Sequence, residues 1–123
     1  MKTLKTSGKT TVYKDHDAIM KVGPRKQILH EAEVLRRLIG LKNVPQLLGV
    51  SPLIGGESDF LVLTMTEVEG RPQIGTLMDE MKKRGVVVNK IEEDNILNDK
   101  DTIGLVGFMS RAKLTGGKNE TSD

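Results

Sequence analysis

The residues best suited to chemistry gather between positions 85 and 108, where two apolar runs enclose an acidic loop. Three consecutive carboxylates stand in that loop: Glu92, Glu93 and Asp94. Carboxylates are groups that can hold metal ions. A run of like charges in a loop is more often simply solvated, so the cluster alone supports either interpretation.

Lys21 lies in a predicted strand and Glu31 in a predicted helix. Charged residues on a helix usually face solvent. An ion pair between a strand and a helix can be purely structural, and it contributes little to stability when it is exposed. The two residues by themselves leave the structural and the functional interpretation open.

Other reactive side chains form no recognisable site. The chain has no cysteine, which removes disulfides, thiolate zinc sites and cysteine nucleophiles together. His16 and His30 lie far apart, without a third ligand at a useful spacing for a metal. Residues 8–10, Gly-Lys-Thr, imitate the end of a phosphate-binding P-loop, yet Thr3 stands where its first glycine is required.

Length and charge describe a small globular chain. Its 123 residues suffice for one domain with a real core. Nineteen basic residues against seventeen acidic ones give a net charge of +2, and this balance, with so few aromatic residues, argues against nucleic-acid binding. No apolar run approaches the length of a membrane span, and the N-terminus lacks an apolar signal segment. We therefore expect a soluble, cytoplasmic protein.

Periodicity and turn residues predict the elements that must position these side chains. Residues 3–23 predict a β-hairpin with a polar turn at 14–17. Residues 27–39 carry apolar side chains at helical spacing and predict a helix that Gly40 ends. Strands are predicted at 44–50 and 60–65, and the near-continuous apolarity of the latter indicates a central strand buried on both faces.

The helix and strands predicted in the second half of the chain are shorter. Residues 74–84 predict an amphipathic helix with Leu77 and Met81 on its apolar face and Gly85 as its C-cap. The apolar runs 86–88 and 103–106 predict two short strands around the acidic loop. The polar end of the chain is predicted to be disordered.

The order of these elements, with several motifs inside them, resembles the protein-kinase-like superfamily, including its aminoglycoside-phosphotransferase-like branch. The resemblance covers residues 7–109 and rests on Lys21, Glu31, the hinge-like segment 67–70 and the segment Asp94-Asn95-Ile96-Leu97. It implies an α+β fold with a kinase-like N-terminal lobe at residues 1–70, built as an antiparallel five-stranded sheet with one packed helix. A vestigial C-terminal lobe at 71–110 and a disordered tail at 111–123 would follow.

The resemblance also implies a site for a nucleotide, ATP with magnesium. Glu31 would pair with Lys21 and align it on the phosphates. Val12 and Ile19 from above and Leu97 from below would enclose the adenine. Met65 would guard the back pocket, with Glu67 and Val68 in the hinge that reads the edge of the base. Asn95 would be a metal ligand if nucleotide binds.

Two positions depart from the family pattern. Lys90 stands where the family has its catalytic aspartate, and Gly107 stands where it has the metal-binding aspartate. An ammonium group is a poor acceptor for the proton of a substrate hydroxyl, and its charge would compete with magnesium. We therefore expect no catalytic residue, and a pseudokinase that acts as a nucleotide-binding or protein-binding regulatory module.

Two alternatives remain. The chain could be a reduced but active kinase for a protein or a small molecule, in which a carboxylate of the acidic loop replaces the missing aspartates. It could also be a small α+β adaptor that binds no nucleotide and contacts a partner through its sheet edge or through the Leu77 and Met81 face. We also expect a protein partner or self-association, because so small a C-terminal lobe would leave apolar residues under-covered.

Overall fold

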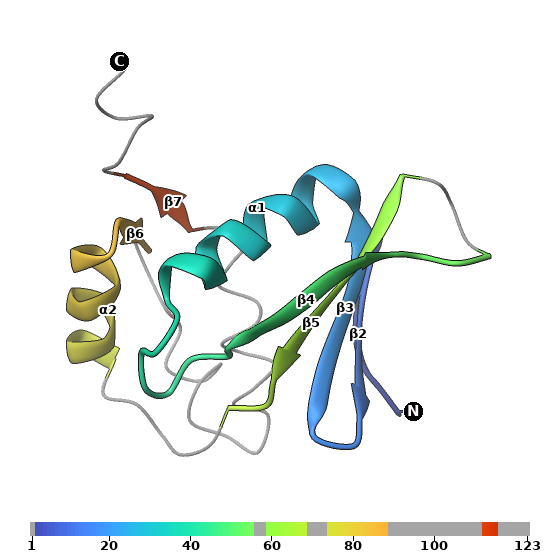
Figure 1. Ribbon diagram of the computed structural model, residues 1–123, viewed down its shortest axis with the longest axis horizontal. Helices are drawn as coiled ribbons and strands as arrows, with labels where there is room; N and C mark the ends of the chain where they lie inside the picture. Colours follow the sequence, from blue (N-terminus) through green and yellow to red (C-terminus); the bar gives the residue numbers. More distant parts are fainter. Residues whose placement is uncertain (1, 56–58, 69–73, 89–111, 116–123) are drawn as a thin grey trace.

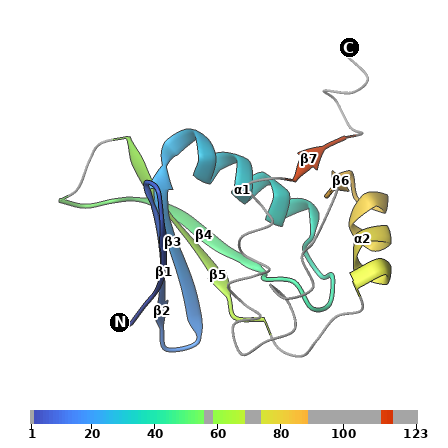
Figure 2. The ribbon, with the colours of Figure 1, turned by 180° about the vertical axis from the view of Figure 1, so that it is seen from behind.

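The computed structural model describes residues 2–55, 59–68, 74–88 and 112–115 of the chain (Figure 1). Within them, the chain has an α+β fold with one main antiparallel sheet and a helix packed on it. A second helix and a small two-stranded sheet complete the described part. Figures 1 and 2 place these smaller elements at one end of the fold, beside the C-terminal end of the packed helix.

The N-terminal third of the chain forms three consecutive strands, β1 (Lys2–Ser7), β2 (Thr10–Asp15) and β3 (Ala18–Pro24). Each connection is a two-residue turn with a residue at positive φ: Gly8 at 59° and His16 at 55°. The predicted hairpin over residues 3–23 is therefore confirmed and gains a third strand. Its second turn is tighter than expected, because β2 and β3 remain paired as far as Asp15 and Ala18.

Two further strands complete the sheet, β4 (Leu47–Pro52) and β5 (Phe60–Thr66), and the order is β1-β2-β3-β5-β4. The chain leaves β3, crosses in a helix and returns as β4, so that β5 pairs with β3 and β4 becomes an outer strand. The helix packs against β3, β4 and β5, and β2 and β1 extend the sheet to the other edge.

The expectation that residues 60–65 are buried on both faces is wrong. β5 is an interior strand, but its burial alternates: Leu61, Leu63 and Met65 are buried, whereas the residues between them are half-buried. An antiparallel sheet with a helix on one face needs apolar side chains on that face only. Because some residues on the other face are also apolar, the sequence of β5 does not display this alternation.

Helix α1 (Arg25–Arg37) begins directly after β3, two residues earlier than the apolar pattern predicts. Pro24 stands at its N-cap with φ of −57° and ψ of 143°, a conformation that the proline ring favours just before a helix. The helix ends at Arg37 with Leu38 as its C-cap, and Gly40 adopts a φ of 84° in the turn that follows. Its inner face contributes Ile28, Ala32 and Leu35 to the core.

Helix α2 (Ile74–Lys83) is followed by strand β6 (Val86–Val87), which pairs antiparallel with β7 (Lys113–Leu114). Residues 112–115, which the sequence predicts to belong to a disordered tail, thus include a short strand. Residues 103–106, the predicted partner of β6, lie outside the described part. Leu77 and Met81 are buried in the same core as α1. None of the described helices is long and apolar enough to span a membrane.

Candidate functional site

Lys21 occupies a buried position in the third strand. Burial along β3 alternates, with Ile19, Lys21 and Gly23 on the side that faces α1. The pleat of a strand places alternate side chains on the same face, so Lys21 follows the apolar residue two positions before it toward the helix. Its residue surface is only 4% exposed, which is rare for a lysine without a partner.

Glu31 comes to meet Lys21 from the inner face of α1. It lies one turn after Ile28 and next to Ala32, so helical periodicity turns its side chain toward the sheet. Because β3 leads directly into α1, ten residues along the chain suffice to bring the two charges together. Glu31 is fully buried.

The two side chains form a buried ion pair in which Lys21 Nζ donates to Glu31 Oε1. The functional interpretation of Lys21 and Glu31 required this contact, and the alternative of an exposed, weak pair is excluded by the burial of both residues. The second carboxylate oxygen, Oε2, has no hydrogen-bond partner among the described residues. Glu31 therefore retains an unused acceptor inside the protein.

Three predicted apolar site residues share the face that carries Lys21. Val12 lies opposite Lys21 in the β2–β3 register, and Ile19 lies opposite Met65 in the β3–β5 register. All three are buried members of the main hydrophobic cluster. The structure brings them together beside the ion pair, where they serve as core within the described residues.

The predicted hinge begins where β5 ends. Glu67 Oε2 forms an ion pair with Lys14 Nζ at 2.7 Å, at a position about one-third exposed. Val68 is half-buried and packs on the core. Gln46 ties the end of β5 down, because its backbone N–H donates to Thr66 Oγ1 at 2.8 Å and its carbonyl accepts from the Thr66 N–H at 2.9 Å. The start of this segment thus has a defined course.

The remaining predicted site residues lie outside the described part of the chain. These are Lys90, Asn95, Leu97 and Gly107, together with the acidic residues Glu92, Glu93 and Asp94. Among the residues that are described, no cluster of three or more histidine or acidic side chains could hold a metal ion. What can be built from the structure is therefore the strand–helix half of the site.

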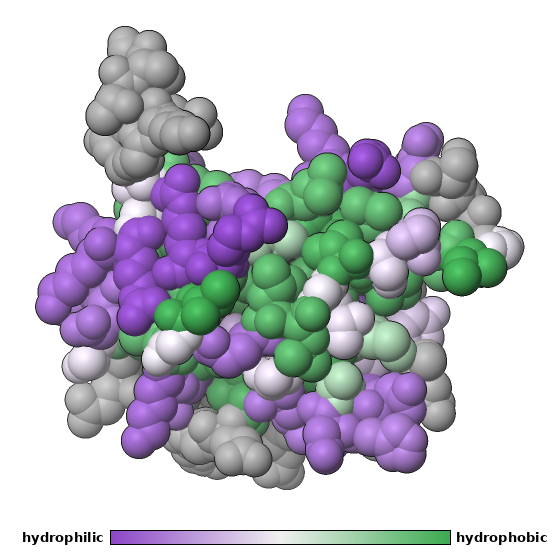
Figure 3. All heavy atoms as spheres, in the orientation of Figure 1, coloured by the Kyte–Doolittle hydropathy of each residue, from purple (hydrophilic) through white to green (hydrophobic). Residues whose placement is uncertain are grey.

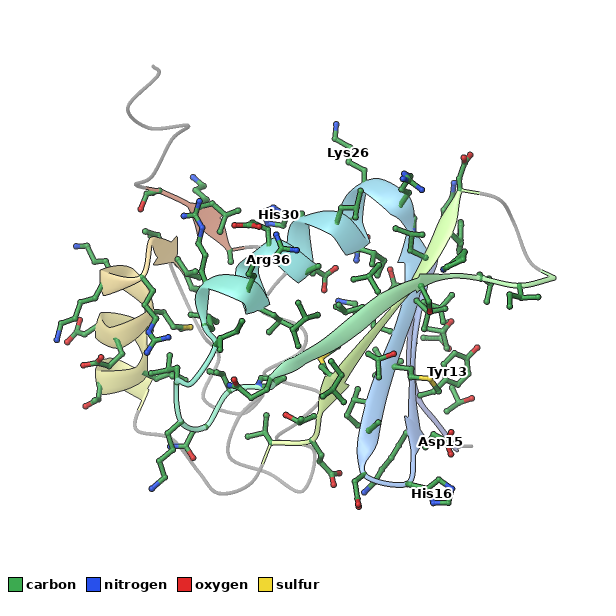
Figure 4. The ribbon with its side chains drawn as sticks, viewed as in Figure 1. Tyr13, Asp15, His16, Lys26, His30 and Arg36 are labelled. Atoms are coloured by element: carbon green, nitrogen blue, oxygen red, sulfur yellow. The ribbon has the colours of Figure 1, made fainter. Side chains whose placement is uncertain are left out.

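A surface hollow of about 440 Å³ opens elsewhere, at the start of α1, and it contains none of the predicted site residues. Its walls are formed by Pro24, Arg25, Lys26, Leu29 and Asp59. Figure 4 shows Lys26 directed away from the sheet, on the side of α1 opposite the core. The hollow is thus separate from the Lys21 and Glu31 pair.

Sequence reasoning did not identify the contacts that hold α1 from its outer side. His30 Nε2 lies 2.9 Å from the carbonyl oxygen of Ala112, and Arg37 Nη1 donates to the carbonyl oxygens of Thr115 and Gly85 at 2.6 and 3.1 Å. The sequence contains no signal for these contacts, since they join residues 48 to 82 positions apart through backbone oxygens.

The arrangement as a whole presents a buried ammonium, held by a carboxylate, at the boundary between a sheet and its helix. Such an ammonium can contact an anionic ligand, and its partner fixes the direction in which it points. No protein-family model matches the chain, and no curated protein matches it either.

Proposed function

We propose that this chain is a kinase-like regulatory module that binds a nucleotide through Lys21 and Glu31 and does not transfer its phosphoryl group. The observation that carries the proposal is the buried ion pair between the third strand and the first helix. The resemblance required this contact from residues ten positions apart, and packing of α1 on the sheet provides it.

The fold supports the finer assignment to a kinase-like N-terminal lobe. Three antiparallel strands precede α1, and the two strands after it complete a single sheet on which the helix packs. Glu67 and Val68 follow directly on β5, as a hinge would. By the resemblance, Lys90 and Gly107 stand where the family has the two aspartates that the chemistry requires, which supports the proposal that no phosphoryl group is transferred.

The test is a calorimetric titration of the whole chain with ATP, with and without magnesium. Lys21→Ala alone would leave the Glu31 charge buried without a partner and could unfold the chain. The informative variant is therefore Lys21→Met combined with Glu31→Leu, since apolar residues of similar volume can replace a buried pair at little cost. Lys26→Met is the matched control, because Lys26 is an exposed lysine of α1.

We expect the wild type and Lys26→Met to bind ATP alike and the double variant to lose binding while remaining folded. Binding that survives in the double variant would refute the role of the ion pair. Transfer of phosphoryl to any acceptor by the wild type would instead favour the active-kinase alternative. Glu92→Gln combined with Glu93→Gln would then tell whether those two carboxylates supply the missing groups.

A protein-binding role is the second candidate, and the outer strand β4 favours it. Leu48 is 60% exposed and Val50 is 39% exposed. Both lie in β4, whose edge facing away from β5 is unpaired within the described part of the sheet. Figure 3 shows hydrophobic side chains gathered over β4 and the neighbouring part of α1. An exposed strand edge with apolar side chains is a site where another strand can add. The Leu77 and Met81 face is not available for this role, because both residues are buried.

A further inference from the structure

Two side chains of α1 hold residues 112–115 against the outer side of the helix. His30 reaches the first of these residues, Ala112, and Arg37 reaches the last, Thr115. A carbonyl oxygen can only accept, so His30 Nε2 carries the proton and donates to Ala112. His30 and Arg37 stand about two helical turns apart, so this segment of backbone is tied along half the length of α1.

The Arg37 guanidinium joins three parts of the fold at one point. Its Nη1 donates to the Gly85 carbonyl, between α2 and β6, and to the Thr115 carbonyl after β7. Its Nε donates to Glu33 Oε2 at 3.3 Å, which orients the group from within α1. The Thr115 N–H in turn donates to the Gly85 carbonyl at 2.7 Å. A planar guanidinium offers its donors in fixed directions, so these contacts are lost together if α1 shifts.

Gly85 makes this convergence possible. Its φ is 79°, and a Cβ at this position would overlap the Thr115 carbonyl oxygen and lie 2.6 Å from Arg37 Nη1. Any other residue would force one of these groups away. The close approach therefore depends on the absence of a side chain at this position.

The same helix carries Glu31, whose carboxylate forms one hydrogen bond among the described residues, the ion pair with Lys21. Because α1 is a continuous helix of 13 residues, a displacement at its Arg37 end moves Glu31 with it. We infer that Arg37 is a positioning residue: by joining α1 to Gly85 and Thr115, it couples the docking of residues 112–115 to the alignment of Lys21. The coupling itself does not require a ligand. Only its use in regulating nucleotide affinity rests on the function proposed above.

The coupling can be measured without nucleotide, through the reactivity of the Lys21 amine. The whole chain is treated with an N-hydroxysuccinimide ester of acetate, and acetylation of Lys21 is quantified by peptide mass spectrometry relative to exposed Lys26. In the wild type, we expect burial and the ion pair to make Lys21 slow to react. Arg37→Ala is expected to raise the relative rate by about fivefold or more, the lower end of typical coupling between sites.

Two variants separate positioning from a general loss of stability. Arg36→Ala removes a neighbouring arginine that also pairs with Glu33 but belongs to the exposed side of α1, and it should leave the Lys21 rate unchanged. Leu77→Ala should open a cavity in the core beside α2 and lower overall stability, and it removes no atom that Arg37 contacts. When the two variants are compared under conditions that give them the same free energy of unfolding, Lys21 should be acetylated more slowly in Leu77→Ala than in Arg37→Ala.

Equal rates in Arg37→Ala and Arg36→Ala would overturn the inference, and so would an equal rise in Leu77→Ala. If Arg37→Ala does not fold, Arg37→Lys replaces it. A lysine keeps the charge but lacks the planar group that donates to the Gly85 and Thr115 carbonyl oxygens. We expect its Lys21 acetylation rate to lie between those of the wild type and of Arg37→Ala. Failure of ATP to bind the wild type would refute the proposed function and leave this result standing. If ATP does bind, Arg37→Ala should weaken its affinity in proportion to the rise in Lys21 reactivity.

Discussion

At the Lys21 and Glu31 pair, strand β3 and helix α1 keep two charges away from water. Desolvation costs several kcal/mol per ion, and their mutual attraction offsets that cost only while both partners are present. The unpaired Glu31 Oε2 adds to the cost, because no described residue replaces its lost hydrogen bond to water. Such a pair is therefore weak evidence for stability.

A double-mutant cycle tests this balance. We expect Lys21→Met alone to lower the free energy of unfolding by about 3–5 kcal/mol, because it leaves a buried carboxylate without a partner. Lys21→Met combined with Glu31→Leu should recover most of that loss, since no buried charge remains. Urea denaturation of the four proteins in the cycle measures both values. A loss in the double variant as large as in the single one would show that packing, not charge, dominates the site.

Gly85 provides a second test at the level of one residue. Gly85→Ala should destabilise the fold by more than Gly40→Ala, although both glycines have positive φ, 79° and 84°. Gly40 has open space around the position of a Cβ, so only backbone strain of about 1–2 kcal/mol is expected there. At Gly85, displacement of Thr115 and Arg37 adds an overpacking cost of about 1–3 kcal/mol. Thermal unfolding of the two variants, if it gave equal losses, would contradict the close approach.

At the scale of elements, helix α1 begins under unfavourable local electrostatics. Its first turn contains Arg25 and Lys26 and no acidic residue, and Pro24 offers no side-chain hydrogen bond to the free N–H groups. Cations are disfavoured at the positive end of the helix dipole. Tertiary packing of the inner face, not local preference, must therefore hold this end of the helix.

Lys26→Glu is accordingly expected to stabilise the protein, by about 0.3–1 kcal/mol at low salt, because it places a negative charge near the helix N-terminus. Lys82→Glu is the matched reversal. Lys82 is an exposed lysine in the last turn of α2, where a cation is favourable, so its replacement should destabilise by a similar amount. Chemical denaturation at low and high salt checks both, and the two effects should shrink together as salt screens them.

At the scale of the whole molecule, the β4 edge of the sheet is more available for association with another chain than the buried inner faces of α1 and α2. β4 is an outer strand with exposed Leu48 and Val50, and no residue from 45 to 54 is charged. Natural sheet edges are commonly protected by charged side chains, which discourage pairing with other strands. The β4 edge lacks this protection.

We therefore expect Val50→Lys to reduce association of the chain at high concentration. Val50 is partly exposed, so a lysine there should leave the fold intact while placing a charge on the edge. Thr6→Lys, at an exposed position of β1 on the opposite edge, is the control and should leave association unchanged. Sedimentation velocity over a range of concentrations compares the two. Equal association by all three proteins would remove β4 from the candidate interfaces.

Much of the local structure follows from the sequence alone. Turn residues and alternation predict the N-terminal strands, and helical spacing predicts α1 and α2 within a few residues. The sequence also predicts that Gly85 ends α2, and its φ of 79° agrees with that role. Lys21 and Glu31 could be chosen as a pair only through the resemblance to the kinase-like family, and the direct passage from β3 into α1 brings them together. These features depend on contacts between near neighbours, which the sequence displays.

Tertiary structure alone decided which faces are buried and what holds the helix from outside. β5 is apolar on both sides in sequence, and only the position of α1 determines that Leu61, Leu63 and Met65 face the core. Neither the burial of both charges of the ion pair nor the meeting of Arg37 with Gly85 and Thr115 is encoded in a local pattern. The reason is physical: burial and long-range hydrogen bonds to backbone oxygens depend on how elements pack, and any residue type supplies the same carbonyl acceptor.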